Sequence, residues 1–261
     1  MQYQYKDYLR NHVVLPGREK ALEKFLTQDY EGMRHKWGNR KSPNSEDALT
    51  WSCFDLLRNL SLDKKIKVLN EIWEDAYQMK INSPFSDKNL HDDEIKIEIG
   101  KQYTGSTFKG TKEEESTEVD ASIELPGVLV FFEAKLYSPM SMKSVKHEHD
   151  QIARKLRIGL DNPLGDGYRD FYFIFLDIAP CDKLICRKSK EEACAPAKEF
   201  HDKWKSAWWF SYYKYGRNNS LKPLKDILKD IPAVNDVRQV AKNMGWLTWT
   251  DLFKDLLRGM I

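Results

Sequence analysis

The stretch Val128-Leu-Val-Phe-Phe-Glu-Ala-Lys135 constrains the fold most, because a run of consecutive apolar residues ends in a carboxylate and an ammonium. Side chains alternate along a strand, so Leu129, Phe131, Glu133 and Lys135 would share one face. Both faces carry large apolar groups, which predicts a central strand covered on both sides. Burying an unpaired charge is very costly, so Glu133 and Lys135 are expected where the sheet opens, paired with each other, or beside a metal ion.

A second strand precedes this one. Residues 118–125 alternate between polar and apolar side chains, and Leu125-Pro-Gly-Val128 supplies a turn with proline and glycine at its central positions. The two runs therefore predict a β-hairpin. If Asp120 and Glu133 point to the same side near its splayed end, their oxygens could hold a hard divalent cation. Lys135 would then orient or activate the attacking water.

Asp120, twelve intervening residues and then Glu133-Ala-Lys135 resemble the motif of the PD-(D/E)XK nuclease superfamily, which has the restriction-endonuclease-like fold. The match covers roughly the middle half of the chain, and Val119 stands where the family name has proline. The resemblance implies that Asp120, Glu133 and the carbonyl of Ala134 bind Mg²⁺ or Mn²⁺, and that Lys135 is catalytic.

The order of the other elements agrees with this resemblance. Residues 94–100 alternate like a strand, residues 145–160 are typical of a helix, and the apolar run 170–177 indicates a further strand. Strand, helix, strand predicts a parallel pair joined by a right-handed crossover. We therefore expect an α/β fold: an αβα sandwich with a mixed central sheet of about four strands and additional N-terminal and C-terminal helices. The predicted divisions are a helical extension (1–43), a nuclease-like core (44–180) and a helical, aromatic-rich, basic segment (181–261).

A helix predicted over residues 44–59 places Glu46 on the same stripe as its apolar residues. The helix dipole and the free amides at a helix N-terminus are by themselves a sufficient structural reason for a carboxylate there. The superfamily often brings a glutamate from the helix before the sheet to the metal, so the resemblance implies that Glu46 completes or extends the site. Asp47, rotated by one residue, is expected to point to the flank.

Two other regions supply a further catalytic candidate, Gln151, which the resemblance implies, and the predicted nucleic-acid contacts. On the crossover helix, Gln151 resembles the glutamine that RecB-like nucleases place near the metal, although their downstream tyrosine has no counterpart and Arg154 stands there instead. In the C-terminal third, aromatic residues recur every three or four positions with bases between them, a pattern typical of a helix core and compatible with base stacking. The residues predicted to contact nucleic acid are Arg154, Lys155, Trp209, Tyr213 and Lys214.

The charge distribution and the composition are compatible with a protein that binds nucleic acid. The 261 residues carry a net charge of only +2, but acids outnumber bases in residues 86–124 and bases outnumber acids in residues 183–230. Two solvated faces of opposite sign would explain the same pattern. The four cysteines have no C-x-x-C spacing, and neither a signal peptide nor a membrane span is recognisable. The chain is therefore expected to be soluble and cytoplasmic, without a membrane partner.

The resemblance, together with these patterns, implies a Mg²⁺- or Mn²⁺-dependent nuclease, with DNA favoured over RNA as substrate. Restriction, phage defence, mobile elements and repair are all compatible settings, as is a homodimer or a partner protein in a multi-component system. Two alternatives stay open: a module that keeps the fold and binds nucleic acid or assembles without cleaving, and an unrelated α/β protein in which the charges form a structural ion pair.

Overall fold

A computed structural model describes residues 3–29, 32–86, 90–105, 116–136, 138, 140–141, 148–166, 170–178, 209–216, 220–232 and 234–261. In chain order its helices and strands are η1 (Tyr8–Asn11), α1 (Glu19–Leu26), α2 (His35–Asn39), α3 (Glu46–Arg58), α4 (Leu62–Tyr77), η2 (Pro84–Ser86), η3 (Asp92–Glu94), β1 (Lys96–Thr104), β2 (Ser116–Leu125), β3 (Val128–Ala134), α5 (Gln151–Asp166), β4 (Asp170–Asp177), α9 (Lys222–Leu228), α10 (Val237–Lys242), β5 (Met244–Thr248) and α11 (Trp249–Met260). Residues 209–215 are also helical.

Within these residues, five strands form one mixed sheet in the order β1-β2-β3-β4-β5. β1, β2 and β3 are successively antiparallel, whereas β3, β4 and β5 run parallel. The connection from β3 to β4 contains α5, as the strand-helix-strand pattern predicts. Because β3, β4 and β5 are parallel, their carboxyl ends lie at one edge of the sheet, where Glu133, Asp177 and Thr248 are found.

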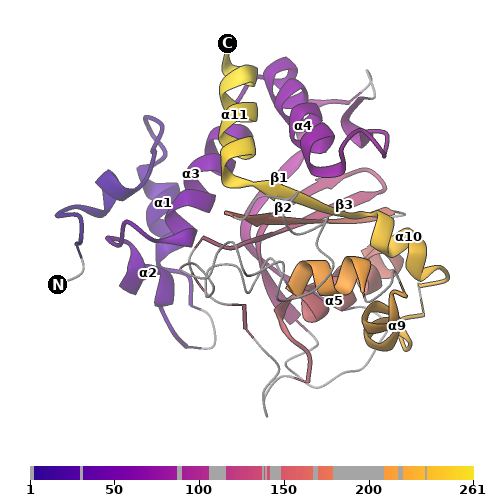
Figure 1. The fold of residues 1–261 in the computed structure, drawn as a ribbon. Coiled ribbons are helices and arrows are strands. Elements are labelled where there is room, and N and C mark those ends of the chain that lie inside the picture. Colours follow the sequence, from indigo (N-terminus) through magenta and orange to yellow (C-terminus); the bar gives the residue numbers. More distant parts are fainter. Residues whose placement is uncertain are drawn as a thin grey trace, which may run out of the picture.

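Helices cover both faces of the sheet, with α3, α4 and α11 on one side and α5 and α9 on the other (Figure 1). Val130, Phe132 and Ala134 of β3 pack into the core on the first side, and Leu129 and Phe131 pack into the core on the second side. The alternation predicted for this run is thus confirmed. Apolar residues on both faces require cover on both faces, which explains why the strand lies in the centre of the sheet.

The structure confirms the mixed α/β class and corrects the predicted boundaries. β1 continues to Thr104, four residues beyond the end of the predicted strand, and α5 begins at Gln151, six residues after the predicted start of that helix. The sheet has a fifth strand, β5, which had been assigned to the helical C-terminal segment. A strand of only five residues is too short to show a clear period-two pattern, so β5 is identified only by its pairing with β4.

Residues at both ends of the chain belong to the same apolar core as the middle. Leu22, Phe25 and Leu26 of α1 pack with α3 and α4, and Leu252 and Leu256 of α11 pack in the same cluster. None of the helices in the described part of the chain combines the length and apolar composition that crossing a bilayer requires.

Candidate functional site

The β2–β3 hairpin opens at Asp120, as the hypothesis of a splayed hairpin requires. Paired residues run from Leu125 and Val128 to Ala121 and Phe132, and beyond them the Ala134 N–H donates to Asp120 Oδ2 at 2.8 Å instead of to the backbone of β2. On the other side of β2, Gly100 of β1 has a left-handed backbone (φ 64°), which bends β1 where it passes Asp120. The carboxylate of Asp120 is thereby turned to the gap between the strands.

Glu133 lies beside Asp120 and is fully buried between two ammonium groups. Its Oε1 is 2.8 Å from Lys135 Nζ, and its Oε2 pairs with Lys155 Nζ from α5. Lys155 Nζ is also 3.4 Å from Asp120 Oδ2. Two carboxylates and two lysines from β2, β3 and α5 therefore form one continuous ion-pair cluster at the carboxyl edge of the sheet.

The charges of this cluster shift one another's pKa values. Burial, helped by the charge of Asp120, raises the pKa of Glu133 to about 7, against the opposing effect of the two lysines. Burial alone would also raise the pKa of Asp120, but Lys155, Lys135 and the Ala134 N–H together hold it below its usual value. Burial would lower the pKa of Lys135, but the surrounding carboxylates raise it. Lys135 is thus an ammonium that can orient a water by donating hydrogen bonds, and it cannot accept a proton.

Glu46 is the first residue of α3, directly after the N-cap Ser45, whose hydroxyl accepts from the Ala48 N–H at 3.2 Å. Its carboxylate accepts from the Leu136 N–H at 2.9 Å and from the Ser138 hydroxyl at 2.7 Å, and it lies 3.3 Å from Lys135 Nζ. Glu46 does reach the site, as predicted. In this arrangement it fixes the segment that follows β3 and helps to hold Lys135.

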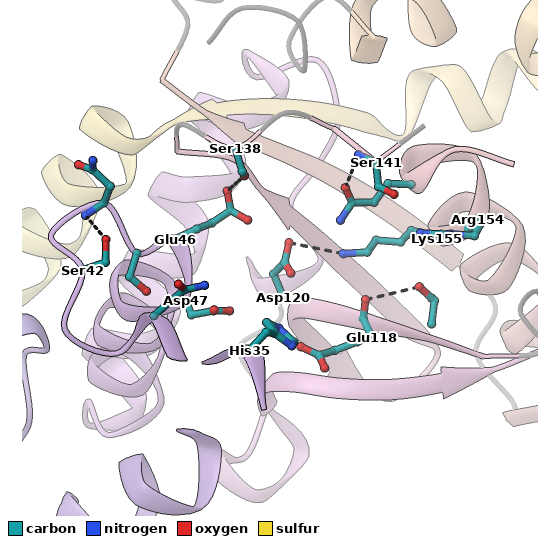
Figure 2. Close-up of a pocket in the computed structure, with 15 residues that line it drawn as sticks. His35, Ser42, Glu46, Asp47, Glu118, Asp120, Ser138, Ser141, Arg154 and Lys155 are labelled. Carbon is teal, nitrogen blue, oxygen red and sulfur yellow. Dashed lines mark hydrogen bonds and ion pairs between the residues drawn. The ribbon is translucent and has the colours of Figure 1, made fainter. Parts of the chain in front are cut away.

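Asp47 also faces the site, so the expectation that it points to the flank is wrong. It lines the same pocket as Glu46, Glu118 and Asp120 (Figure 2). A helical wheel assumes that only one face of a helix contacts the rest of the protein. The N-terminus of α3 instead borders a pocket between β2 and α2, and both of its first two residues face that pocket. Burial is the main reason that the pKa of Asp47 is raised to about 7; Lys36 opposes the shift, and the neighbouring acids Asp120, Glu46 and Glu118 add to it.

The pocket has a volume of about 530 Å³ and is lined by residues from several elements. α2 contributes His35 and Asn39, residues 42–45 and the start of α3 form a second wall, and α5 contributes Gln151, Arg154 and Lys155. Figure 2 shows Asp47, Glu118 and Asp120 turned toward the same space, with His35 beside them. The N-terminal helices therefore form part of the candidate site.

Two residues that sequence reasoning missed are Glu118 and Lys36. Glu118 is on β2, two residues before Asp120, and forms an ion pair with Lys36 Nζ of α2. The Lys36 side chain is only 2% exposed and its ammonium lies 4.6 Å from the centre of the Phe25 ring. No sequence signal marks Lys36, because a lysine in a polar stretch ordinarily faces solvent.

Gln151, the further catalytic candidate, and the residues predicted to contact nucleic acid fall into two groups. Gln151 and Arg154 line the pocket, and the Gln151 side chain accepts from the Ser141 N–H at 3.2 Å. Lys155 also lines it, but its side chain is buried and paired with Glu133 instead of being exposed to nucleic acid.

In the helical segment 209–215, Tyr213 is 5% exposed and its hydroxyl donates to Asp150, so its ring packs in the core instead of facing solvent where a base could stack. Trp209 packs against the same core, and Lys214 donates to the Met244 carbonyl. The structure thus places these three side chains against the sheet. Phe200, Trp204 and Trp208, from the same aromatic pattern, lie outside the described residues.

The donor chemistry of the site suits a hard divalent cation. Carboxylates from α3, β2 and β3 meet in a poorly solvated region, and an ammonium, that of Lys155, lies between Asp120 and Glu133. As the described side chains stand, no three or more of His, Cys, Asp or Glu are arranged to hold a metal ion together. The ammonium of Lys155 occupies the space between the Asp120 and Glu133 carboxylates.

Comparisons with known proteins give no independent indication of identity. The chain matches no protein-family model, no curated protein and no solved structure. Its fold and its site must therefore be interpreted from its own residues.

Proposed function

We propose that this protein is a metal-dependent nuclease that hydrolyses phosphodiester bonds of nucleic acid, with DNA favoured over RNA. One observation carries the proposal: Asp120, Glu133 and Lys135 lie together where the central hairpin splays, next to an acid-lined pocket. The alternative of a simple structural ion pair explains Glu133 and Lys135. It does not explain why Asp47, Glu118 and Asp120 line the same pocket.

The arrangement of the sheet supports a restriction-endonuclease-like core. Three antiparallel strands, a crossover helix and a parallel strand follow in that order, and the acidic residues stand on the second and third strands. β5 extends this core beyond the four strands expected. Fold alone does not determine activity, so the proposal depends on the site.

Each residue has a distinct role in the proposed reaction. Asp120, Glu133 and the Ala134 carbonyl would hold Mg²⁺ or Mn²⁺, with Asp47 as a further carboxylate in the same pocket. The bound cation would lower the pKa of the attacking water and offset charge on the transition state. Lys135 orients the water, Glu46 keeps Lys135 and the segment after β3 in place, and Gln151 and Arg154 are positioned to contact the scissile phosphate.

Cleavage assays with paired variants test the proposal. Labelled single-stranded and double-stranded DNA and RNA, circular and linear, are incubated with Mg²⁺, Mn²⁺ or EDTA. We expect cleavage only with a metal, and Glu133→Gln and Lys135→Met to lower it by about 100-fold or more while binding persists, because each removes a charge at the reacting centre. Glu124→Gln is the matched control: Glu124 is also a buried acid of the hairpin paired with a lysine, Lys101, but outside the pocket.

Each contrary outcome has a clear meaning. Cleavage in EDTA, or full activity of both site variants, would contradict a metal-dependent nuclease. Salt-sensitive binding of nucleic acid by the parent protein, with no cleavage under any condition, would favour the non-cleaving module instead.

A further inference from the structure

Lys155 occupies an unusual position for a lysine near the start of a surface-layer helix. It stands one turn into α5, its side chain is 3% exposed, and its ammonium reaches across to the carboxyl edge of β3. There it pairs with Glu133 Oε2 and lies 3.4 Å from Asp120 Oδ2. Figure 2 shows the long side chain pointing at Asp120 along one wall of the pocket.

An ammonium in this position does what a metal ion would do, since it offsets two buried carboxylates that would otherwise repel each other. It also occupies the space between them. A divalent cation prefers several oxygen ligands at short distances and cannot share them with a cation of the chain. Binding of a metal by Asp120 and Glu133 therefore requires Lys155 to withdraw.

Lys155 and Lys135 differ in their freedom to move. The backbone of Lys135 is fixed on both sides, because its N–H donates to the Leu176 carbonyl at 2.7 Å and its carbonyl accepts from the Trp249 indole at 3.0 Å. Its ammonium is also held by Glu46. Both lysines have the same flexible four-carbon stem, but Lys155 lines the open pocket and Lys135 is not among the residues that line it. Lys155 therefore has open space beside it into which its ammonium can turn.

We propose that Lys155 is a built-in counter-ion that holds the Asp120–Glu133 pair until a divalent cation displaces it, and that the released ammonium then turns into the pocket and contacts the substrate phosphate. This inference rests on the proposed function and adds to it an exchange of cations at the site. It predicts that the parent protein binds metal more weakly than its carboxylates alone would.

Titration of Mn²⁺ by calorimetry, without nucleic acid, tests the exchange directly. Lys155→Met should bind Mn²⁺ at least tenfold more tightly than the parent protein, because the competing ammonium is gone. Arg154→Met is the matched control: it removes the same charge from the adjacent residue of α5, which lines the pocket but has no ion pair with either carboxylate. Its affinity for Mn²⁺ should stay within about threefold of the parent, because Arg154 contacts neither carboxylate and does not compete for the position of the metal.

A second measurement uses the parent protein alone and does not depend on the folding of a variant. The buried Lys155 should react slowly with an amine-selective acylating reagent, and saturating Mn²⁺ should increase its acylation several-fold by mass spectrometry, whereas Lys135 should show no such increase. Lys155→Gln, which keeps a hydrogen-bond donor for Glu133 without the charge, should repeat the affinity gain of Lys155→Met.

The outcomes separate this inference from the proposed function. Equal Mn²⁺ affinity in the parent and both Lys155 variants, or acylation of Lys155 that Mn²⁺ does not change, would overturn the exchange and leave a metal-dependent nuclease standing. Absence of Mn²⁺ binding in every variant would overturn both. Tighter binding in the Lys155 variants, with a parent protein that cleaves no nucleic acid, would support the exchange and reject the nuclease.

Discussion

Asp47 and Asp120 face the same pocket, but their surroundings shift their pKa values in opposite directions. Asp47 has a raised pKa of about 7, caused mainly by burial and then by neighbouring acids, with Lys36 opposing the shift. The pKa of Asp120 is lowered, because two lysines and a backbone N–H outweigh the effect of burial. The two acids should therefore have opposite effects on stability when they are replaced.

The sign follows from proton linkage. From about pH 4 to pH 7 the unfolded chain has released the proton of Asp47 while the folded protein keeps it, so a rise in pH favours unfolding. Asp47→Asn should thus raise the melting temperature at pH 8 and change it little at pH 4. Asp120 contributes stability above its unfolded pKa and loses it as pH falls, so Asp120→Asn should lower the melting temperature at pH 8.

Thermal melts of both variants in EDTA at pH 4 and pH 8 check this prediction. For a chain of this size, about 1 kcal/mol corresponds to about 2–4 °C, so shifts of a few degrees are measurable. A rise in melting temperature for Asp120→Asn would mean that repulsion among the acids outweighs their pairing with Lys135 and Lys155.

At the scale of elements, the packing of α11 on α4 contains a buried acid. The Asp255 side chain of α11 is fully buried, neither of its oxygens has a hydrogen-bond partner among the described residues, and Lys254 Nζ is 4.0 Å away. Burial, with added effects of Asp75, Asp251 and Glu71 and an opposing effect of Lys254, raises the pKa of Asp255 to about 7. The contact of the two helices is thus most favourable when Asp255 is protonated.

Replacement of Asp255 by Asn should stabilise the protein above pH 7, because it removes a charge that the folded state solvates poorly. Between about pH 4 and pH 7 the parent protein loses this part of its stability as the pH rises, and Asp255→Asn should not. We expect a gain on the order of a few kcal/mol at pH 8, because the parent protein must ionise a buried carboxyl there, at a cost of about 1.4 kcal/mol for each unit by which the pKa is raised. Urea unfolding at pH 5 and pH 8 measures it.

The exposed Asp226 of α9 provides the control, since Asp226→Asn should leave the unfolding free energy nearly unchanged at both pH values. Equal stability of parent protein and Asp255→Asn at pH 8 would show that Asp255 is solvated or paired more effectively than the contacts of α4 and α11 suggest.

At the scale of the whole molecule, the C-terminal residues complete the sheet and the core. β5 pairs with β4, and Trp249, Leu252 and Leu256 join the cluster around α4. Without them β4 would become an edge strand with its aromatic residues exposed. The chain is therefore expected to unfold as one cooperative unit that includes both ends.

Truncation after residue 180 should abolish the cooperative thermal transition, because β4 loses a neighbour on one side and α4 loses α11. Circular dichroism melts of the truncated and full-length chains measure this directly. Removal of Ile261 alone is the control, since that residue is 98% exposed and its loss should leave the melting temperature unchanged. A sharp, reversible transition in the truncated chain would show that residues 1–180 form an independent domain.

The sequence by itself determined the central strand and the chemistry at its end. A strand with consecutive apolar residues needs cover on both faces, so it can lie only in the interior of a sheet. A glutamate and a lysine at its end must then be paired or lie where the sheet opens to solvent. The turn at Pro126-Gly127 then set the hairpin, and the alternation before it placed Asp120 opposite the end of β3. These features are local, so the residues that encode them are close in sequence.

Only the tertiary structure decided which other side chains reach that point. Lys36, Asp47 and Lys155 reach the site from α2, α3 and α5. Lys36 pairs with Glu118, and Lys155 pairs with Asp120 and Glu133, and all three acids are distant in sequence from the lysines that they contact. The pairing of β5 with β4 likewise joins residues far apart along the chain. Such contacts depend on how the helices pack across the sheet. A periodic pattern shows which face of a helix is apolar, but it does not show which neighbouring element that face packs against.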